Sequence, residues 1–479
     1  MTRNAQNKTC SSCLRAFVVA FIGFTAFVAT GLRAADGDVH LARYAEISGV
    51  LRELRPAQLP VELLTLPTLA PDAPWNAWIA AHDAEIRGRL PLGDEDMLVN
   101  WLLHGASFTT QPDVVLPDNA TADTAAVTAF ATLINARLDD FVRALQSPGT
   151  DERRTFARRF FEGNGFKLDT DAGVKEFGGH LLAAISRVAA EEGAVAEQIA
   201  AADGSDRATA LGIRSHLLSD RGLSLDSALE TGFGVEQALA AMNARGLVKP
   251  GSVARVAIVG PGLDFATKDA GLDLYPVQTL QPFAVIDALA RLGLSAAGST
   301  PDVVCFDISP RVLTHIATAR MRAAAGAPYT LSLPLMKGRD YAPEFRQYWT
   351  ALGQRVGTPG DRPADARIDA RAELRTVLVP AATVQRVSAA NLNIITGRQE
   401  GPRFDLIIAT NVFQYYDTLD QALAFANVEA MLKNGGFLLT NTPLPEILWV
   451  PMELVDSTAV KYDASGSGDE VLWYQRMAG

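Results

Sequence analysis

A change of rhythm near residue 250 constrains the fold of this chain more than any other feature of its sequence. After that point, short apolar runs alternate with stretches that have helical spacing of apolar residues. Near-continuous apolar strands that alternate with helices are typical of a parallel sheet covered on both faces. The expected strands are 254–259, 302–306, 376–379, 404–409 and 436–440. The expected helices are 281–292, 310–325 and 419–432.

The end of the chain departs from this alternation. Residues 458–462 and 470–476 are strand-like, and a Ser-Gly-Ser-Gly turn at 465–468 joins them. Two such runs around a glycine-containing turn predict an antiparallel hairpin. We therefore expect residues 251–479 to form an α/β domain, a Rossmann-like doubly wound sheet that closes with a hairpin.

The region before the change, 36–246, is rich in Ala, Leu, Arg and Glu, and strand-like alternation is scarce in it. Apolar residues recur at helical spacing in several stretches, and Gly and Pro separate these stretches. We expect an all-helical N-terminal domain, with the boundary to the α/β domain at 248–251. The expected helices are 75–90, 96–103, 123–145, 174–202 and 224–244.

Residues 1–35 have the pattern of a targeting segment. Arg3, Lys8 and Arg15 precede the uninterrupted apolar run 16–32, and small residues follow it. This pattern predicts a secretory signal peptide or, alternatively, an uncleaved membrane anchor. Either would place the body of the protein outside the cytoplasm, periplasmic, secreted or anchored; without a functional leader it would be cytoplasmic. We expect membrane contact only through this segment.

Charge and metal-ligand spacing exclude several partners. The net charge is −11, and all 54 acidic residues lie after Arg33. An acidic body repels phosphate backbones, so we expect no nucleic-acid partner. The six histidines show no ligand spacing, and Cys305 is the only cysteine after the leader, so we expect no metal site.

Three segments after the expected strands carry the candidate chemistry. Gly260 and Gly262 follow the first strand, where a glycine turn lets a ligand approach the backbone closely. Asp307 ends the second strand, where a carboxylate can accept hydrogen bonds from both hydroxyls of a ribose; together with Ser309 it also suits the start of a helix. The fourth strand ends in Thr410 and Asn411, and a helix end with a Gly turn follows at 431–438.

In their order, these segments resemble the class I S-adenosylmethionine-dependent methyltransferases, in particular the chemotaxis-receptor glutamate methyltransferases. The resemblance covers about 252–476 and includes Asp307-Ile308-Ser309, Asn391-Leu392, Thr410-Asn411-Val412 and Leu432-Lys433-Asn434-Gly435-Gly436. It implies S-adenosylmethionine as the cofactor. It places Asp307 on the ribose, Asn391 and Leu392 near the adenine, and Thr410 and Asn411 beside the methionine moiety. Gly260 and Gly262 would shape the floor of the site.

The chain also departs from this family pattern. Thr410 stands where the family has an arginine, and Gln281 stands where it has a glutamate that contacts the cofactor. The stretch 264–276 is additional, and we expect it to act as a lid. Tyr415 and Tyr416 are candidates for the acceptor site, and Asp264 is a candidate proton acceptor; ordinary packing and a solvated loop acid are the alternatives. Nothing in the sequence names the methyl acceptor.

The sequence is also compatible with two other functions. An exported, non-catalytic binding or scaffold protein with the same fold is favoured by the leader, because S-adenosylmethionine is a cytoplasmic metabolite. A nucleotide-dependent oxidoreductase is the second alternative, although a nicotinamide site would have a third glycine where Phe265 stands.

Overall fold

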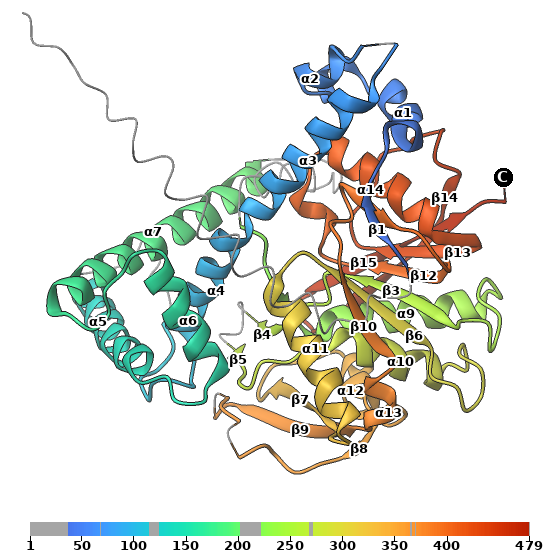
Figure 1. The fold of residues 1–479 in the computed structure, drawn as a ribbon. Helices are drawn as coiled ribbons and strands as arrows, with labels where there is room; N and C mark the ends of the chain where they lie inside the picture. Colours follow the sequence, from blue (N-terminus) through green and yellow to red (C-terminus); the bar gives the residue numbers. More distant parts are fainter. Residues whose placement is uncertain are drawn as a thin grey trace, which may run out of the picture.

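A seven-stranded sheet forms the centre of the computed structural model (Figure 1), which describes residues 37–67, 69–114, 124–201, 222–267, 272–364, 366–368 and 370–478. The strand order is β10-β6-β3-β12-β13-β15-β14. The first five strands are parallel, and β15 runs antiparallel to both of its neighbours. The predicted doubly wound sheet with a terminal hairpin is confirmed. Its strands are β3 (Arg255–Val259), β6 (Asp302–Asp307), β10 (Val387–Asn391), β12 (Phe404–Ala409), β13 (Leu432–Thr440), β14 (Met452–Lys461) and β15 (Gly468–Arg476).

Helices cover both faces of this sheet, as the uninterrupted apolar strands require. On β3, Val256 and Ile258 face one apolar core, while Ala257 and Val259 face another. The first core includes α9 (Leu229–Ala244), α10 (Gln281–Arg291) and α11 (Pro310–Ala324). The second includes α14 (Thr418–Met431), α1 (Tyr44–Glu53) and α3 (Asp72–Gly88).

One strand expected in the parallel sheet lies elsewhere. Residues 376–379 belong to β9 (Ala372–Val379), which is antiparallel to β7 (Tyr329–Met336) and to β8 (Thr358–Pro359) in a separate three-stranded sheet. Helix α12 (Pro343–Ala351) lies between β7 and β8 in the chain, and the one-turn helix α13 (Ala381–Val384) follows β9. The expectation was wrong because an apolar run looks alike in both sheet types. The neighbour of β6 is instead β10, whose Val-Ser-Ala-Ala-Asn sequence is far less apolar.

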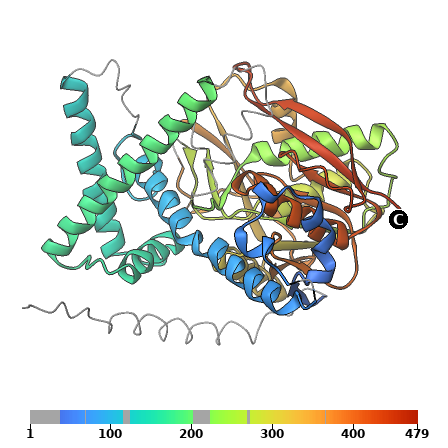
Figure 2. The same cartoon turned by 90° about the horizontal axis from the view of Figure 1, so that it is seen from above.

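The N-terminal helices fall into two groups (Figures 1 and 2). Helices α1 and α3 pack on the α/β domain, and the short strand β1 (Val39–Leu41) pairs with β11 (Gly397–Gln399). The other group has its own apolar core. It consists of α4 (Leu90–His104), α5 (Thr124–Gln146), α6 (Glu152–Gly163) and α7 (Asp171–Ala201). The one-turn helices η1 (Pro56–Gln58) and α2 (Val61–Leu64) connect α1 to α3.

The predicted helix over 224–244 begins later than expected. Helix α9 starts at Leu229, and the preceding residues are extended. Strand β2 (Asp226–Ser227) is parallel to β4 (Asp264–Thr267), which is antiparallel to β5 (Leu272–Asp273). These pairings give the backbone of 226–227 partners that a helix would otherwise supply. The stretch 264–276, expected as a lid, contributes β4 and β5 to this small sheet.

The leader predicted within 1–35 lies outside the described residues. Over the part of the chain that the structure describes, no helix combines the length and apolarity needed to cross a membrane.

Candidate functional site

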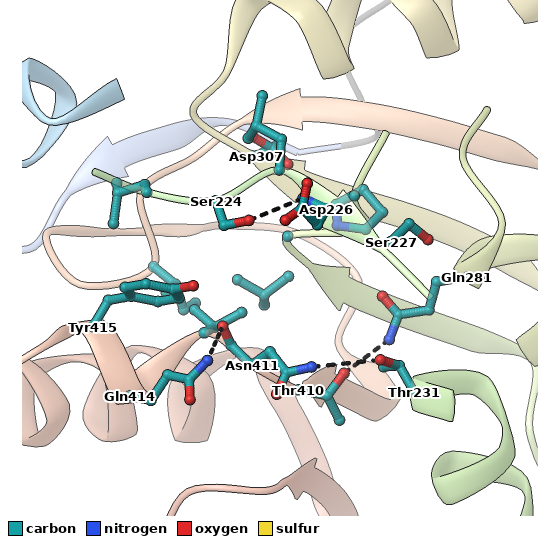
Figure 3. Close-up of a pocket in the computed structure, with 18 of the residues that line it drawn as sticks. Ser224, Asp226, Ser227, Thr231, Gln281, Asp307, Thr410, Asn411, Gln414 and Tyr415 are labelled. Carbon is teal, nitrogen blue, oxygen red and sulfur yellow. Dashed lines mark hydrogen bonds between the residues drawn. The ribbon is translucent and has the colours of Figure 1, made fainter. Parts of the chain in front are cut away.

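A cavity of about 610 Å³ lies at the carboxyl ends of the central strands (Figure 3). In an open α/β sheet, ligands bind at this edge, where the strand order reverses. Here the reversal falls between β3 and β12, and residues that follow both strands line the cavity. The volume is within the range of small-molecule sites. Nine of the predicted site residues line it: Gly260, Gly262, Gln281, Asp307, Leu392, Thr410, Asn411, Tyr415 and Tyr416.

The glycine turn after β3 forms one side of the cavity. Gly260 and Gly262 have φ of 63° and 73°, a left-handed conformation that side chains other than glycine rarely adopt. A Cβ atom at Gly262 would lie 2.9 Å from Cβ of Ser227 and 3.0 Å from the carbonyl oxygen of Asp226. Glycine is therefore required at 262 for the segment 224–228 to pack against this turn.

Asp307 ends β6 and is buried at the cavity wall. Its Oδ1 atom accepts a hydrogen bond from the backbone N–H of Ser309 at 2.7 Å. Burial raises the pKa of Asp307 to about 7, although hydrogen bonds from the backbone of Ser309 and Ile308 and the positive charge of Arg87 act in the opposite direction. Ser309 is the residue before α11, so the ribose and helix-start interpretations of this segment are compatible.

The side chains of Gln281 and Thr410 are in contact at the carboxyl end of β12. The Nε2 atom of Gln281 donates a hydrogen bond to Oγ1 of Thr410 at 3.0 Å, and both side chains are buried. Gln281 is the first residue of α10, and Thr410 directly follows β12. Gln281, at the position of the family's glutamate, therefore contacts Thr410, at the position of the family's arginine. Both residues line the cavity.

Asn411 adopts φ of 59°, which is uncommon for a residue other than glycine. Its backbone N–H donates to Oδ1 of Asn441 at 2.8 Å, and Nδ2 of Asn441 donates back to Oδ1 of Asn411 at 2.6 Å. These two bonds hold the strained backbone in place. Nonglycine residues in this conformation are concentrated at functional sites.

The two predicted adenine contacts are placed differently. Leu392 is buried and lines the cavity, followed by Asn393 and Ile394. Asn391 is exposed, and its Oδ1 accepts a hydrogen bond from Nη1 of Arg87 at 2.7 Å. Thus Asn391 is held by the N-terminal helix α3, while the next three residues form the wall.

Tyr415 and Tyr416 lie beyond the end of β12 on the cavity wall. Tyr416 is buried, and the guanidinium of Arg89 lies 5.6 Å from the centre of its ring. Burial raises the pKa of Tyr416. Asp264 is on β4, where its backbone pairs with Asp226.

Several lining residues were not predicted from the sequence. They include Asp226 on β2, Thr231 on α9, Asn441 after β13, Asp469 on β15 and Leu90 at the start of α4. Asp226, Asp307 and Asp469 are the acidic residues among the described lining residues, and none of those lining residues is Lys, Arg or His. The described part of the cavity wall therefore carries carboxylates and no basic side chain.

The strand order and the antiparallel final pair of the seven-stranded sheet are those of the class I methyltransferase-type α/β fold. Searches of family models and of curated proteins find no match to this chain. Among solved structures, the chain is similar in part to the N-methyltransferase NodS from Bradyrhizobium japonicum WM9, with 12% identity over 51% of this chain and 97% of NodS and a TM-score of 0.26. The glycopeptide N-methyltransferase MtfA complexed with S-adenosylmethionine has 13% identity over 52% of this chain and 94% of MtfA, with a TM-score of 0.26. Magnesium protoporphyrin IX methyltransferase from Synechocystis PCC 6803 has 12% identity over 51% and 80%, with a TM-score of 0.24.

Proposed function

We propose that this protein is an S-adenosylmethionine-dependent methyltransferase. The observation that carries the proposal is the position of Asp307, a buried carboxylate at the end of β6 in the same cavity wall as the left-handed turn of Gly260 and Gly262. In a class I fold, this arrangement suits a ribose diol bound across the turn. The three carboxylates of the cavity wall, Asp226, Asp307 and Asp469, also suit a ligand with a net positive charge. S-adenosylmethionine is such a ligand, because it carries a sulfonium and an ammonium group.

Each part of the cavity has a role in this proposal. Asp307 accepts hydrogen bonds from the ribose hydroxyls, while Leu392 and Ile394 pack against the adenine. Thr410, directly after β12 and fixed by Gln281, lies beside the methionine moiety. S-adenosylmethionine supplies an electrophilic methyl carbon, so the protein has mainly to align an acceptor with that carbon and exclude water.

The charge of the cavity wall disfavours a nicotinamide cofactor. A dinucleotide brings a pyrophosphate, which would meet Asp226, Asp307 and Asp469 without a Lys, Arg or His among the described lining residues. Like charges in a partly closed site raise the electrostatic cost of binding. Calorimetry with S-adenosylmethionine, S-adenosylhomocysteine and NAD separates the two cofactor classes, and a preference for NAD would overturn the proposal.

Replacement of the ribose ligand is the direct test of the site. Asp307→Ala removes hydrogen bonds to a charged group, each worth about 1.5–3 kcal/mol, so we expect affinity for S-adenosylhomocysteine to fall at least about tenfold. The matched control is Asp302→Ala, at the other end of β6, where the side chain pairs with Arg386 at the surface. Equal affinities of the two variants would contradict the assignment of Asp307.

The pKa of Asp307 gives an independent readout. Because burial raises this pKa to about 7, a large fraction of the unliganded protein has a neutral Asp307 near that pH. Only the ionised carboxylate accepts from both hydroxyls, so affinity for S-adenosylhomocysteine should rise between about pH 6 and pH 8. A calorimetric titration series over that range measures the rise, and Asp307→Asn should abolish it.

An exported, non-catalytic binding protein is the second candidate, and the apolar run 16–32 favours it. N-terminal sequencing of the protein from its native host distinguishes a cleaved leader from a retained one. Binding of S-adenosylhomocysteine without methyl transfer to any acceptor would favour this candidate over the enzyme.

A further inference from the structure

The two sides of the cavity differ in chemistry. On the β6 and β10 side, the wall contains Asp307 and apolar residues, among them Phe306, Leu392 and Ile394. On the β12, β13 and β15 side, the wall is polar and contains Thr231, Asn411, Asn441, Thr442 and Asp469. Strand β3 lies between the two sides. A cofactor that binds through its ribose at Asp307 and extends across the glycine turn therefore directs the end opposite its base toward the polar wall.

The polar wall is assembled from separate elements into one hydrogen-bonded chain. Nδ2 of Asn411 donates to Oγ1 of Thr231 at 3.4 Å, and Nδ2 of Asn441 donates to Oδ1 of Asn411 at 2.6 Å. The same Nδ2 of Asn441 lies 3.0 Å from Oδ2 of Asp469, to which it also donates. Asp469 is thereby joined to the residue with the left-handed backbone at the end of β12, and is half-buried at the cavity.

The charge of this wall restricts what binds there. Asp469 and Asp226 bring carboxylates to the cavity in addition to the proposed ribose ligand, and the described lining residues include no basic side chain. A carboxylate acceptor would add a further negative charge to this site, whereas an ammonium group would be attracted to it.

We infer that the polar wall of Thr231, Asn411, Asn441 and Asp469 binds the amino group of a primary or secondary amine, and that an amine nitrogen is the methyl acceptor. This inference rests on the proposed function. Asp469 binds the ammonium form, and the asparagine and threonine oxygens orient it. The acceptor class is therefore an amine and not a carboxylic acid.

The reaction balances with the groups present. The bound ammonium transfers one proton to the carboxylate of Asp469, which leaves a neutral nitrogen with a lone pair. This nitrogen forms a bond to the methyl carbon as the carbon–sulfur bond breaks, and the bonding pair stays on sulfur to give S-adenosylhomocysteine. The product is a methylammonium, and Asp469 then loses its proton to water.

A matched set of small acceptors tests the inference. The probes are 2-phenylethylamine, 2-phenylethanol and 3-phenylpropanoate, which share a ring and a short chain and differ in the head group. Methyl transfer from radiolabelled S-adenosylmethionine and calorimetric binding to the complex with S-adenosylhomocysteine are measured for each probe with the full chain. We expect the amine to bind at least about tenfold more tightly than the alcohol or the acid, and to be the probe that is methylated.

Variants assign the selectivity to Asp469. Asp469→Asn keeps the shape of the side chain and removes its charge, so it should lower the preference for the amine over the alcohol about tenfold. Its circular dichroism spectrum should match that of the unmodified protein, which shows that the variant is folded. The matched control is Glu453→Gln, which removes an exposed charge from β14 of the same hairpin and should leave the preference unchanged.

The outcomes separate the two proposals. If the unmodified protein does not bind S-adenosylhomocysteine, the proposed function is overturned. Binding of S-adenosylhomocysteine together with equal or better use of 3-phenylpropanoate would leave that function intact and overturn the amine inference. An amine preference that Asp469→Asn leaves unchanged would also overturn it.

Discussion

The two groups of N-terminal helices have similar sequence patterns but different relations to the candidate site. Helices α1 and α3 share an apolar core with α14 and the sheet, and that core includes the cavity residues Val259, Phe306 and Leu392. Helices α4–α7 enclose a separate core, in which no described cavity residue takes part. Figure 2 shows α5 and the start of α7 on the side of the molecule away from the sheet, with α3 and α4 leading toward it.

This difference shows that helical periodicity identifies a helix but not its partner. All of these helices carry apolar residues at spacing that fits one buried face. The partner is determined by specific contacts, such as the hydrogen bond that Nδ2 of Asn393 in the α/β domain donates to Oδ1 of Asp83 on α3 at 2.9 Å. We infer that the first group belongs functionally to the α/β domain, although the chain order places it with the helical region.

A pair of buried tryptophans tests this division with the largest expected effect. Trp75 lies in the core shared with the sheet, and Trp101 lies in the core of α4–α7; both are at most 1% exposed, and both donate an indole hydrogen bond. Trp→Ala at either position should lower the free energy of unfolding by about 3–5 kcal/mol. Chemical denaturation followed by circular dichroism measures both losses.

The binding of S-adenosylhomocysteine distinguishes the two positions. Trp75→Phe removes the indole N–H with a smaller loss of packing, and we expect it to weaken binding because its core reaches the cavity wall. Trp101→Phe should leave the affinity within about twofold of the unmodified protein. Equal losses of affinity in both variants would contradict the division into two groups.

The sequence predicts the central part of the site well, for a local reason. Gly260 and Gly262 lie in the turn after β3, and Asp307 is the last residue of β6; parallel strands bring their carboxyl ends to one edge. The resemblance to the methyltransferases also predicts Gln281 and Thr410 beside the cofactor, and both line the cavity. Asn441 and Asp469 were missed, because their approach to Asn411 depends on the pairing of β13 with β15.

Two errors in the predicted fold have the same physical origin. The run 376–379 is a strand, but its partner β7 lies about forty residues earlier, and nothing in the run itself reveals an antiparallel neighbour. Residues 224–228 have residue types compatible with a helix, yet the hydrogen bond from Leu263 N–H to the carbonyl of Leu225 at 2.9 Å and the pairing with β4 keep them extended. In both cases long-range hydrogen bonds override local pattern.

Asp83 links α3 to the cavity wall, so its replacement also tests the difference between the two helix groups. We expect a smaller loss of stability than for the tryptophan variants. Its carboxylate accepts hydrogen bonds from Nδ2 of Asn393 at 2.9 Å, from Oγ1 of Thr396 at 2.7 Å and from Nε of Arg87 at 2.7 Å. Asp83→Ala should cost about 1.5–3 kcal/mol of stability and lower affinity for S-adenosylhomocysteine about fivefold. The control Asp72→Ala removes an exposed acid from the first turn of the same helix and should leave the affinity unchanged.

The smallest expected effect is a pH dependence of stability, which arises where His82 of α3 contacts α14 of the α/β domain. His82 on α3 and Asp420 on α14 are joined by a hydrogen bond of 2.6 Å between Nε2 and Oδ1. Burial disfavours the charged imidazole, but the hydrogen bonds and charges of Asp420 and Glu85 outweigh it, so the pKa of His82 is raised above 6.5. Asp417 also faces this pair, and burial together with the charge of Asp420 raises its pKa.

Because the folded-state pKa of His82 is above the unfolded value, the stabilisation is complete below about pH 6.5 and is lost as pH rises through the folded pKa. His82→Gln should therefore cost about 1 kcal/mol at about pH 6 and less at about pH 9, as measured by urea denaturation at each pH. Asp420→Asn should show the same trend, and the double variant should cost less than the sum of the two single variants, since each removes one half of the same pair. A cost of His82→Gln that stays constant with pH would show that His82 contributes through packing and not through its charge, with its ring stacked on Trp78 of the same helix at 4.9 Å between centroids.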